Sequence, residues 1–413
     1  MCNKKHTDFI GITSQFYFCG IPFRLDSYRK CTYGCIYCYV RTRGGNFTLK
    51  NQCFANVPEL QRYLDNAFAN KPANTVISEC LRHRLPLHWG GMSDPFQPCE
   101  KRYKISLSIL QILNTYNYPL IISTKSDLLI SEPYLSLLKK YPNLVVQISL
   151  CTSDDSLRQK LEPKAPSVNK RLKTMRILNE NGIKTYCRLQ PLLLNINSND
   201  KKLIKLLKRA GCKKVIIEHY KAPIDLKKHK EQILNSTIGY NIRSIYNKLG
   251  AKQVGREYVL PSEVKTKNLS FIVKCIHDEG MKYCAADNDL QYLGDADCCC
   301  GIDDVDGFEN WFHHNIALAI RRGYRARSIN YSLISKEWIP KRSIRMYLNS
   351  KCRNNAENLN KLKSMKDFIL HKWNHPFSAN SPTEFYNIRL DKKIDKAFNY
   401  RFNPENNKYR RPS

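Results

Sequence analysis

Three cysteines stand close together near the start of the chain, in the segment RKCTYGCIYCYVR at residues 29–41. Cys31, Cys35 and Cys38 follow the pattern C-x3-C-x2-C, and the segment holds no histidine. Structural zinc takes four protein ligands, and catalytic zinc favours three ligands with a histidine or carboxylate among them. Three thiolates in one short loop instead suit three irons of a four-iron four-sulfur cluster. The spacing therefore predicts a cluster whose fourth iron is open to an outside ligand.

A second group of possible metal ligands lies in CIHDEGMKYC (275–284) and DADCCCG (295–301). Its members are Cys275, His277, Cys284, Cys298, Cys299 and Cys300. We expect an auxiliary iron-sulfur cluster or a zinc site here. Three consecutive cysteines do not easily turn toward one metal, so at most two of them would join Cys284 and Cys275. The alternative is a turn of small residues with incidental thiols, some of them buried.

The segment 319–347 mixes cations with aromatic rings. It holds Arg321, Arg322, Arg325, Arg327, Lys341, Arg342 and Arg345 together with Tyr324, Tyr331, Trp338 and Tyr347. Arginines neutralise phosphates and aromatic rings stack on bases, so the segment suits a nucleic acid. A solvated helical face covering the rest of the protein explains the same pattern equally well.

A regular series of strands and helices must position the first cysteine group. After a first strand within IPFRLDSYRK (21–30), apolar runs predict strands at 85–91, 119–126, 144–150, 183–194 and 213–220. Amphipathic stretches predict helices at 100–116, 131–141, 167–182 and 199–211. Strands that alternate with helices of this length argue for a parallel sheet built from βαβ units.

The series predicts an α/β fold, a partial (β/α)6 barrel of the TIM type, with a doubly wound sheet as the alternative. Ligands bind at the carboxyl ends of the strands in such barrels. The rhythm is lost after about residue 250, so we predict a barrel domain at 1–250 and a Cys-rich, basic helical extension at 251–413. The tail NPENNKYRRPS (403–413) is expected to be disordered.

The composition indicates where the protein acts and what kind of partner it binds. The 413-residue chain has 42% hydrophobic residues and no apolar run long enough for a membrane span, and its first residues lack the apolar region of a secretion signal. We therefore expect a cytoplasmic protein without membrane contact, in which clustered cysteines indicate metal or redox chemistry. Its net charge of +32 favours a polyanionic partner, DNA or RNA, although biased codon usage alone produces such a composition.

The run FRLDSYRKCTYGCIYCYVR (23–41) resembles the cluster motif of radical S-adenosylmethionine (radical SAM) enzymes, in particular their spore photoproduct lyase-like, or DNA repair photolyase-like, branch. The likeness continues in order through GGMSDPFQPCEKRY (90–103), ISTKSDLL (122–129) and LEPKAPSVNKRLKTMRILNENGIKTYCRLQPLL (161–193). The resemblance implies a barrel whose cluster binds S-adenosylmethionine, which one electron cleaves to a 5′-deoxyadenosyl radical. A flavodoxin or ferredoxin is the expected electron donor.

The resemblance also suggests residues for the cofactor. Cys31, Cys35 and Cys38 match the cluster ligands. The matching positions for S-adenosylmethionine are Gly90, Gly91, Met92, Lys125, Ser149, Arg188 and Gln190. The glycines would lie against the methionyl amino group and Lys125 against the carboxylate. A tight turn, a solvated lysine and a local turn partner are the plain alternatives for Gly90, Lys125 and Ser149. Asp94 and Gln97 would face the same opening, and helix capping accounts for Asp94 equally well.

The chain departs from spore photoproduct lyase at one position. A cysteine that returns a hydrogen atom in the lyase corresponds to Gly91 here, so thymine-dimer repair is doubtful for this chain. Cys80, Cys99 and Cys151 are expected to be buried structural thiols. Tyr37 and Tyr39 flank Cys38 as in the lyases, where tyrosines relay a radical; packing around the cluster is the alternative.

These observations favour a radical SAM enzyme that acts on a nucleic acid or nucleotide, in repair or modification. A radical SAM enzyme that modifies a peptide or protein with the help of an auxiliary cluster is the second hypothesis. The third is a non-catalytic, metal-stabilised nucleic-acid-binding protein. The substrate and the bond that is broken do not follow from the sequence.

Overall fold

A computed structural model describes residues 5–6, 8–13, 16, 19–42, 52–69, 72–311, 316, 320, 329–335, 339–342, 364–376, 382–383, 388–394 and 397–402. The chain divides into two compact units. The first comprises Met1–Ile10, Arg24–Arg62 and Leu87–Tyr283, and the second comprises Gly11–Phe23, Tyr63–Pro86 and Cys284–Ser413. Among the described residues, no helix is long and apolar enough to cross a membrane.

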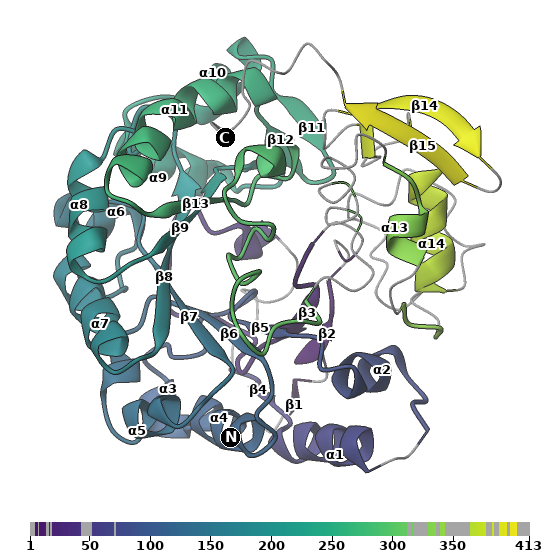
Figure 1. Ribbon diagram of the computed structural model, residues 1–413. Helices are drawn as coiled ribbons and strands as arrows, with labels where there is room; N and C mark the ends of the chain where they lie inside the picture. Colours follow the sequence, from purple (N-terminus) through teal and green to yellow (C-terminus); the bar gives the residue numbers. More distant parts are fainter. Residues whose placement is uncertain are drawn as a thin grey trace. The chain divides into compact units, whose positions relative to one another are not determined.

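A row of parallel strands forms the centre of the first unit (Figure 1). It consists of β3 (Phe23–Leu25), β5 (Leu87–Trp89), β6 (Leu120–Thr124), β7 (Leu144–Ser149), β8 (Lys184–Leu192) and β9 (Lys214–His219). In the full sheet order β2 (Ile10–Ile12) follows β3 and β13 (Lys282–Ala285) follows β9. Every residue of β6 is buried, as expected for a strand covered on both faces. The predicted α/β fold with a mostly parallel central sheet is confirmed.

Helices alternate with these strands, and Figure 1 shows α7 and α8 on the outer side of β8 and β9. The series runs α3 (Glu100–Tyr103), α4 (Ile105–Thr115), α5 (Tyr134–Lys139), α6 (Asp155–Leu161), α7 (Val168–Glu180) and α8 (Lys201–Arg209). Asp154, Ser167 and Asp200 cap the amino ends of α6, α7 and α8 with their side-chain oxygens. Short 3-10 turns lie at Tyr39–Thr42 and Leu128–Ile130.

The helix predicted at 100–116 is divided into α3 and α4. Lys104 adopts a left-handed backbone between them, with a φ of 51°. The buried Glu100 carboxylate accepts hydrogen bonds from the Ser106 and Leu107 amides at 2.9 and 2.8 Å. Glu100 therefore caps a new helix start, an arrangement that apolar periodicity does not reveal.

The strand–helix series continues beyond residue 250, contrary to the prediction. After α9 (Lys228–Ile238), α10 (Ile242–Lys248) and a small sheet of β10 (Ala222–Pro223), β12 (Glu257–Val259) and β11 (Lys252–Val254), the helix α11 (Ser262–Asp278) leads into β13. Because α11 packs on α8 and β13 joins the main sheet, the first compact unit extends to Tyr283 rather than to residue 250.

The remaining elements are short. They are β1 (Lys5–His6), β4 (Phe54–Ala55), α1 (Val57–Phe68), α2 (Val76–Arg82), the 3-10 helix Asn288–Leu293, α13 (Ser332–Ser335), α14 (Met365–Trp373), β14 (Ile388–Ile394) and β15 (Ala397–Phe402). In the second unit the Trp373 ring packs on Tyr400 at 5.2 Å between centroids. Most of the basic segment 319–347 and the whole tail 403–413, for which disorder was predicted, lie outside the described residues.

Candidate functional site

Two glutamines hold the cysteine loop, residues 30–38, that follows β3. Oε1 of the buried Gln97 accepts hydrogen bonds from the Thr32 amide at 2.9 Å and the Thr32 hydroxyl at 3.0 Å, and its Nε2 donates to the Lys30 carbonyl at 2.8 Å. Gln52 accepts from the Lys30 amide at 2.9 Å and donates to its carbonyl at 2.7 Å. Both side chains hydrogen-bond to the backbone of Lys30, which precedes Cys31, and Gln97 also binds Thr32, which follows it. The two glutamines therefore hold the start of the cysteine loop in place.

The three cysteines gather around one small apolar cluster. Cys35 is buried in it with Tyr33, and Cys31 and Cys38 pack against it. Burial raises the pKa of the Cys31 thiol to about 12. Thiolates in such surroundings need positive charge nearby, which metal ions supply. The donor set of the loop therefore fits a group that three thiolates hold.

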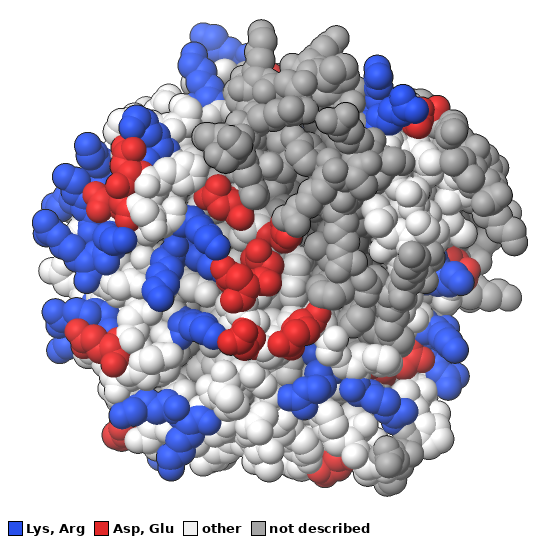
Figure 2. All heavy atoms as spheres, viewed as in Figure 1, with Lys and Arg blue, Asp and Glu red and all other residues white. Residues whose placement is uncertain are grey.

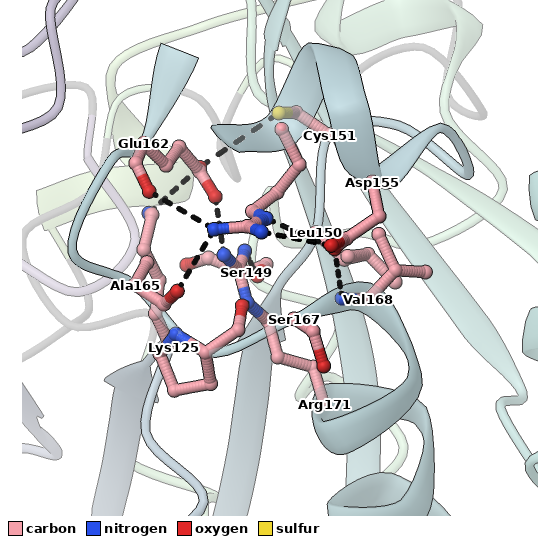
Figure 3. Close-up of polar contacts among 12 residues, drawn as sticks. Lys125, Ser149, Leu150, Cys151, Asp155, Glu162, Ala165, Ser167, Val168 and Arg171 are labelled. Carbon is pink, nitrogen blue, oxygen red and sulfur yellow. Dashed lines mark hydrogen bonds and ion pairs between the residues drawn. The ribbon is translucent and has the colours of Figure 1, made fainter. Parts of the chain in front are cut away.

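A buried ion triad lies beside this loop, formed by Lys125, Glu162 and Arg171 (Figure 3). Lys125 Nζ lies 3.6 Å from Glu162 Oε1, and Arg171 Nη2 lies 2.5 Å from Glu162 Oε2. Burial alone would raise the pKa of Glu162, but the two cations outweigh it and lower that pKa to about 2. Within the triad, two cations thus face one carboxylate.

The triad reaches the cysteines through Lys125. After burial, the Lys125 ammonium is the strongest electrostatic influence on the Cys35 thiol, and it favours the thiolate. Arg171 also donates from Nη1 to the Ser149 carbonyl at 2.9 Å, at the end of β7. The structure thus brings Lys125 and Ser149, two of the predicted cofactor residues, to one place. Their contact with a cofactor stays a prediction.

Glu162 is also the partner of two further side chains. The Tyr37 hydroxyl donates to Glu162 Oε1, and the Cys151 thiol donates to the same oxygen at 3.7 Å. Cys151 is buried as expected, and so is Cys80, whereas Cys99 is half-buried near Gln52. Sequence reasoning did not single out Glu162 or Arg171, although both stand in the quoted run LEPKAPSVNKR.

The glycine turn after β5 has two different glycines. Gly90 has a φ of 104°, and a Cβ added there would lie 2.2 Å from the Ser123 carbonyl oxygen. Gly90 is therefore required by the close approach of β5 and β6. A Cβ added at Gly91 would meet nothing within 4 Å. The Met92 amide donates to the buried Asp26 at 3.0 Å, and Arg24 pairs with Asp26 at 2.7 Å.

Asp94 connects the turn to the next strand. Its carboxylate accepts hydrogen bonds from the Thr124 hydroxyl and the Lys125 amide, both at 2.7 Å, and from the Phe96 amide at 2.9 Å. Helix capping, one explanation for this residue, is wrong, because α3 begins only after Cys99. Asp94 instead sets the backbone of Lys125 relative to the turn.

A row of polar side chains crosses the strands between this site and β8. Arg188 donates to Gln147 Oε1 at 2.8 Å and also to the Gln190 side-chain oxygen. Gln147 Oε1 accepts in addition from the Ser123 hydroxyl at 3.1 Å, and Ser123 Oγ lies 2.7 Å from His88 Nε2. The predicted residues Arg188 and Gln190 thus belong to one network that starts at β5. The other members of the network, His88, Ser123 and Gln147, were not predicted, because they become neighbours only through the register of the sheet.

The two tyrosines that flank Cys38 differ in their surroundings. Tyr37 is half-buried and bound to Glu162, whereas Tyr39 is exposed and donates to the Gly91 carbonyl. Tyr39 therefore joins the cysteine loop to the turn after β5. A radical relay through either tyrosine stays a prediction.

The second cysteine group is only partly assembled. The Sγ atoms of Cys298, Cys299 and Cys300 all lie within 4.8 Å of one another. The sulfur positions therefore leave room for all three thiols at one ion, whereas we expected at most two; metal binding stays a prediction. Cys284 on β13 and Cys275 on α11 are buried and are not members of this group. The basic segment 319–347 was predicted to contact nucleic acid. Of the cations and aromatic residues named there, only Tyr331, Lys341 and Arg342 are among the described residues.

Part of the chain, which includes the cysteine loop, is similar to known proteins. Residues 25–210 match the family model of the Radical SAM superfamily. An uncharacterized protein of Methanocaldococcus jannaschii is 26% identical over 182 residues, which are 42% of this chain and 61% of the relative. An uncharacterized protein of Mycobacterium tuberculosis is 25% identical over 204 residues, 46% of this chain and 55% of the relative. The chain thus spans little more than half the length of such curated relatives.

Two solved structures are similar to part of this chain. A cysteine-to-serine mutant of spore photoproduct lyase is 14% identical, with a TM-score of 0.49 over 68% of this chain and 79% of the lyase chain. SuiB of Streptococcus suis is 15% identical, with a TM-score of 0.41 over 65% of this chain and 49% of the SuiB chain.

Proposed function

We propose, from the premise that residues 25–210 form a radical SAM domain, that this chain is an enzyme whose Cys31, Cys35 and Cys38 hold a four-iron four-sulfur cluster beside an S-adenosylmethionine site. When bound, these groups supply a 5′-deoxyadenosyl radical that removes a hydrogen atom from a substrate. The observation that carries the proposal is the gathering of the three cysteines on one small apolar cluster, where the charge of the Lys125 ammonium favours the thiolate form of Cys35.

The residues around the loop have defined tasks in this proposal. Lys125 faces the negative charge of the thiolates and is available to a cofactor carboxylate, while Glu162 holds it in place. Gln97 and Gln52 fix the loop backbone, which keeps the three thiols in one arrangement before any metal arrives. The open space at Gly91 lets a ligand approach the backbone of the turn after β5.

A nucleic acid or nucleotide is the substrate class that we favour. The net charge of +32 supports it. Helix α8 carries a row of exposed cations. They are Lys201, Lys202, Lys205, Lys208 and Arg209. Figure 2 shows Lys and Arg gathered on the side of the view where Figure 1 has α8. Repair or modification of a base or sugar would use such contacts to hold the phosphate backbone.

One observation supports the second hypothesis, a peptide- or protein-modifying radical SAM enzyme. The three convergent thiols at 298–300 are suited to an auxiliary metal centre, which a nucleotide substrate does not require. The non-catalytic hypothesis predicts metal and nucleic-acid binding without any cofactor cleavage.

An anaerobic cleavage assay tests the catalytic proposal. Reconstituted and reduced protein is expected to convert S-adenosylmethionine to 5′-deoxyadenosine, and Cys35→Ala is expected to abolish this activity. Cys212→Ala, which removes a buried thiol that donates to the Lys214 carbonyl at 3.1 Å, is the matched control. A wild-type protein with four irons that never cleaves S-adenosylmethionine would leave only the binding hypothesis.

The substrate class is tested by running the same assay with deuterated DNA, RNA or peptide and measuring deuterium in 5′-deoxyadenosine. Binding of DNA is expected to weaken as salt rises and on replacement of Lys201, Lys202 and Lys205 by glutamate. Deuterium transfer from peptide alone would favour the second hypothesis. Nucleic-acid binding that does not respond to salt would contradict phosphate contacts.

A further inference from the structure

We propose that Cys298, Cys299 and Cys300 together bind one thiophilic metal ion, with Zn²⁺ as the reference ion, at a site separate from the cysteine loop. The three residues belong to the second unit and are followed by Gly301. We call residues 298–301 the cysteine turn.

The backbone explains how three consecutive side chains meet. In a strand, neighbouring side chains point to opposite faces, which would separate the thiols. Here the Gly301 amide donates to the Cys298 carbonyl at 3.0 Å and closes a tight turn. Gly301 has a φ of 67°, a left-handed conformation that glycine adopts without strain. The turn therefore brings Cys298 and Cys300 to the same side, with Cys299 between them.

The separations of the sulfurs suit a single ion. The Sγ atoms of Cys299 and Cys300 are 3.8 Å apart, and all three lie within 4.8 Å of one another. A tetrahedral ion with metal–sulfur bonds of about 2.3 Å holds its sulfurs roughly 3.8 Å apart. Thiolates on different irons of a cluster are separated further, because the iron–iron edge lies between them. The geometry thus favours one ion over an auxiliary iron-sulfur cluster.

The surroundings of the turn enclose its sulfurs. The Cys300 amide lies 3.4 Å from Cys298 Sγ and donates to it, as amides do to metal-bound sulfur. Cys298 and Cys300 are buried, and Cys299 is half-buried. A Cβ at Gly20 would lie 3.1 Å from Cys298 Sγ and 3.2 Å from the Trp311 ring, so backbone and ring enclose this sulfur closely.

The charge around the turn calls for a cation. Residues 295–306 contain five aspartates and no lysine or arginine. Asp303 accepts from the Asp297 amide at 2.9 Å through Oδ2, and its Oδ1 is buried without a hydrogen-bond partner among the described residues. Three thiolates added to this segment would repel one another unless a cation binds. Binding releases the thiol protons to solvent and requires no oxidant or reductant.

The fourth position of the ion is assigned to water. Cys19 is half-buried and directly precedes Gly20, but among the described residues its sulfur does not lie within 4.8 Å of all three thiols. Cys19→Ser is therefore expected to leave Co²⁺ binding unchanged.

The test uses the full chain with Cys31, Cys35 and Cys38 replaced by alanine, so that the first site cannot contribute metal. After treatment with a chelator and a reductant, this protein is titrated with Zn²⁺ or Co²⁺. We expect about one equivalent to bind, with the sulfur-to-cobalt charge transfer and d–d absorption of a tetrahedral thiolate site. Replacing Cys298, Cys299 and Cys300 by serine is expected to lower binding to below roughly a tenth of an equivalent.

Cys80→Ala is the matched control, because it removes a buried thiol of the same unit that lies outside the turn. It is expected to retain the full equivalent. Since the triple serine variant can misfold, Cys299→Ser alone is measured too; it replaces only the half-buried thiol and is expected to weaken Co²⁺ binding at least about tenfold. Full binding by both serine variants, or none by the parent, would overturn the proposal. Neither result depends on cleavage of S-adenosylmethionine.

Discussion

The ammonium group of Lys125 lies 3.6 Å from the Glu162 carboxylate, although Lys125 directly follows β6 and Glu162 directly follows α6. Arg171 holds the second carboxylate oxygen, and Tyr37 connects the same carboxylate to the cysteine loop. A buried carboxylate thus orients the cation whose charge favours the thiolate form of Cys35. This relationship leads to the first two predictions.

Glu162→Gln is expected to destabilise the protein strongly. The substitution leaves Lys125 and Arg171 as two buried cations without a counter-charge, and breaking a buried pair typically costs about 3–5 kcal/mol. Urea unfolding of the metal-free protein measures the effect. Glu180→Gln is the control, because its pair with Arg176 is exposed and should contribute less than about 1 kcal/mol. Equal unfolding free energies for the two variants would rule out a structural role for the triad.

Acid is expected to weaken the folded state through Glu162. Its pKa is lowered to about 2 in the fold from an ordinary value of 4.5, so the unfolded chain takes up the proton first. The stability that Glu162 contributes is therefore complete above pH 4.5 and is lost as the pH falls toward 2. Unfolding free energies measured across this window should fall more steeply for the wild type than for Glu162→Gln. Parallel curves would contradict the assignment.

The glycines after β5 are expected to respond differently to alanine. Gly90→Ala places a Cβ against the Ser123 carbonyl in a left-handed conformation, which should cost about 1–3 kcal/mol or more. Gly91→Ala meets open space and should change stability by less than roughly 0.5 kcal/mol. Thermal melting of the two variants compares them directly. A Gly91→Ala variant as unstable as Gly90→Ala would show that the turn is tighter than described.

Gln97→Leu is expected to loosen the cysteine loop. It removes the hydrogen bonds to Thr32 and Lys30 while keeping a buried side chain of similar size. Replacing a residue that holds a metal ligand in place typically lowers the metal affinity by about 10–100-fold. The variant should therefore lose iron to a chelator faster than the wild type does. Iron content and the electron paramagnetic resonance signal of reduced protein report this loss. Gln111→Leu on the exposed side of α4 serves as the control and should retain iron like the wild type.

Much of the barrel could be predicted from local patterns. The apolar runs that become β6 and β7 and the capped amphipathic stretch that becomes α7 lie within the predicted ranges. The break at Lys104 was not predictable, because the capping carboxylate of Glu100 precedes the break and leaves the periodicity unchanged. The extension through α11 and β13 was missed because the Cys-rich composition there obscured an ordinary helix and strand.

The spacing of Cys31, Cys35 and Cys38 and the order of strands and helices are properties of neighbouring residues. They were enough to predict the fold and to suggest an iron-sulfur cluster, which stays a prediction. Folding alone decided that Glu162 joins Lys125, Arg171 and Tyr37, because a buried charge finds its partners on other elements. Folding also decided that three consecutive thiols meet in one turn, since the direction of a side chain depends on backbone angles that residue types only bias.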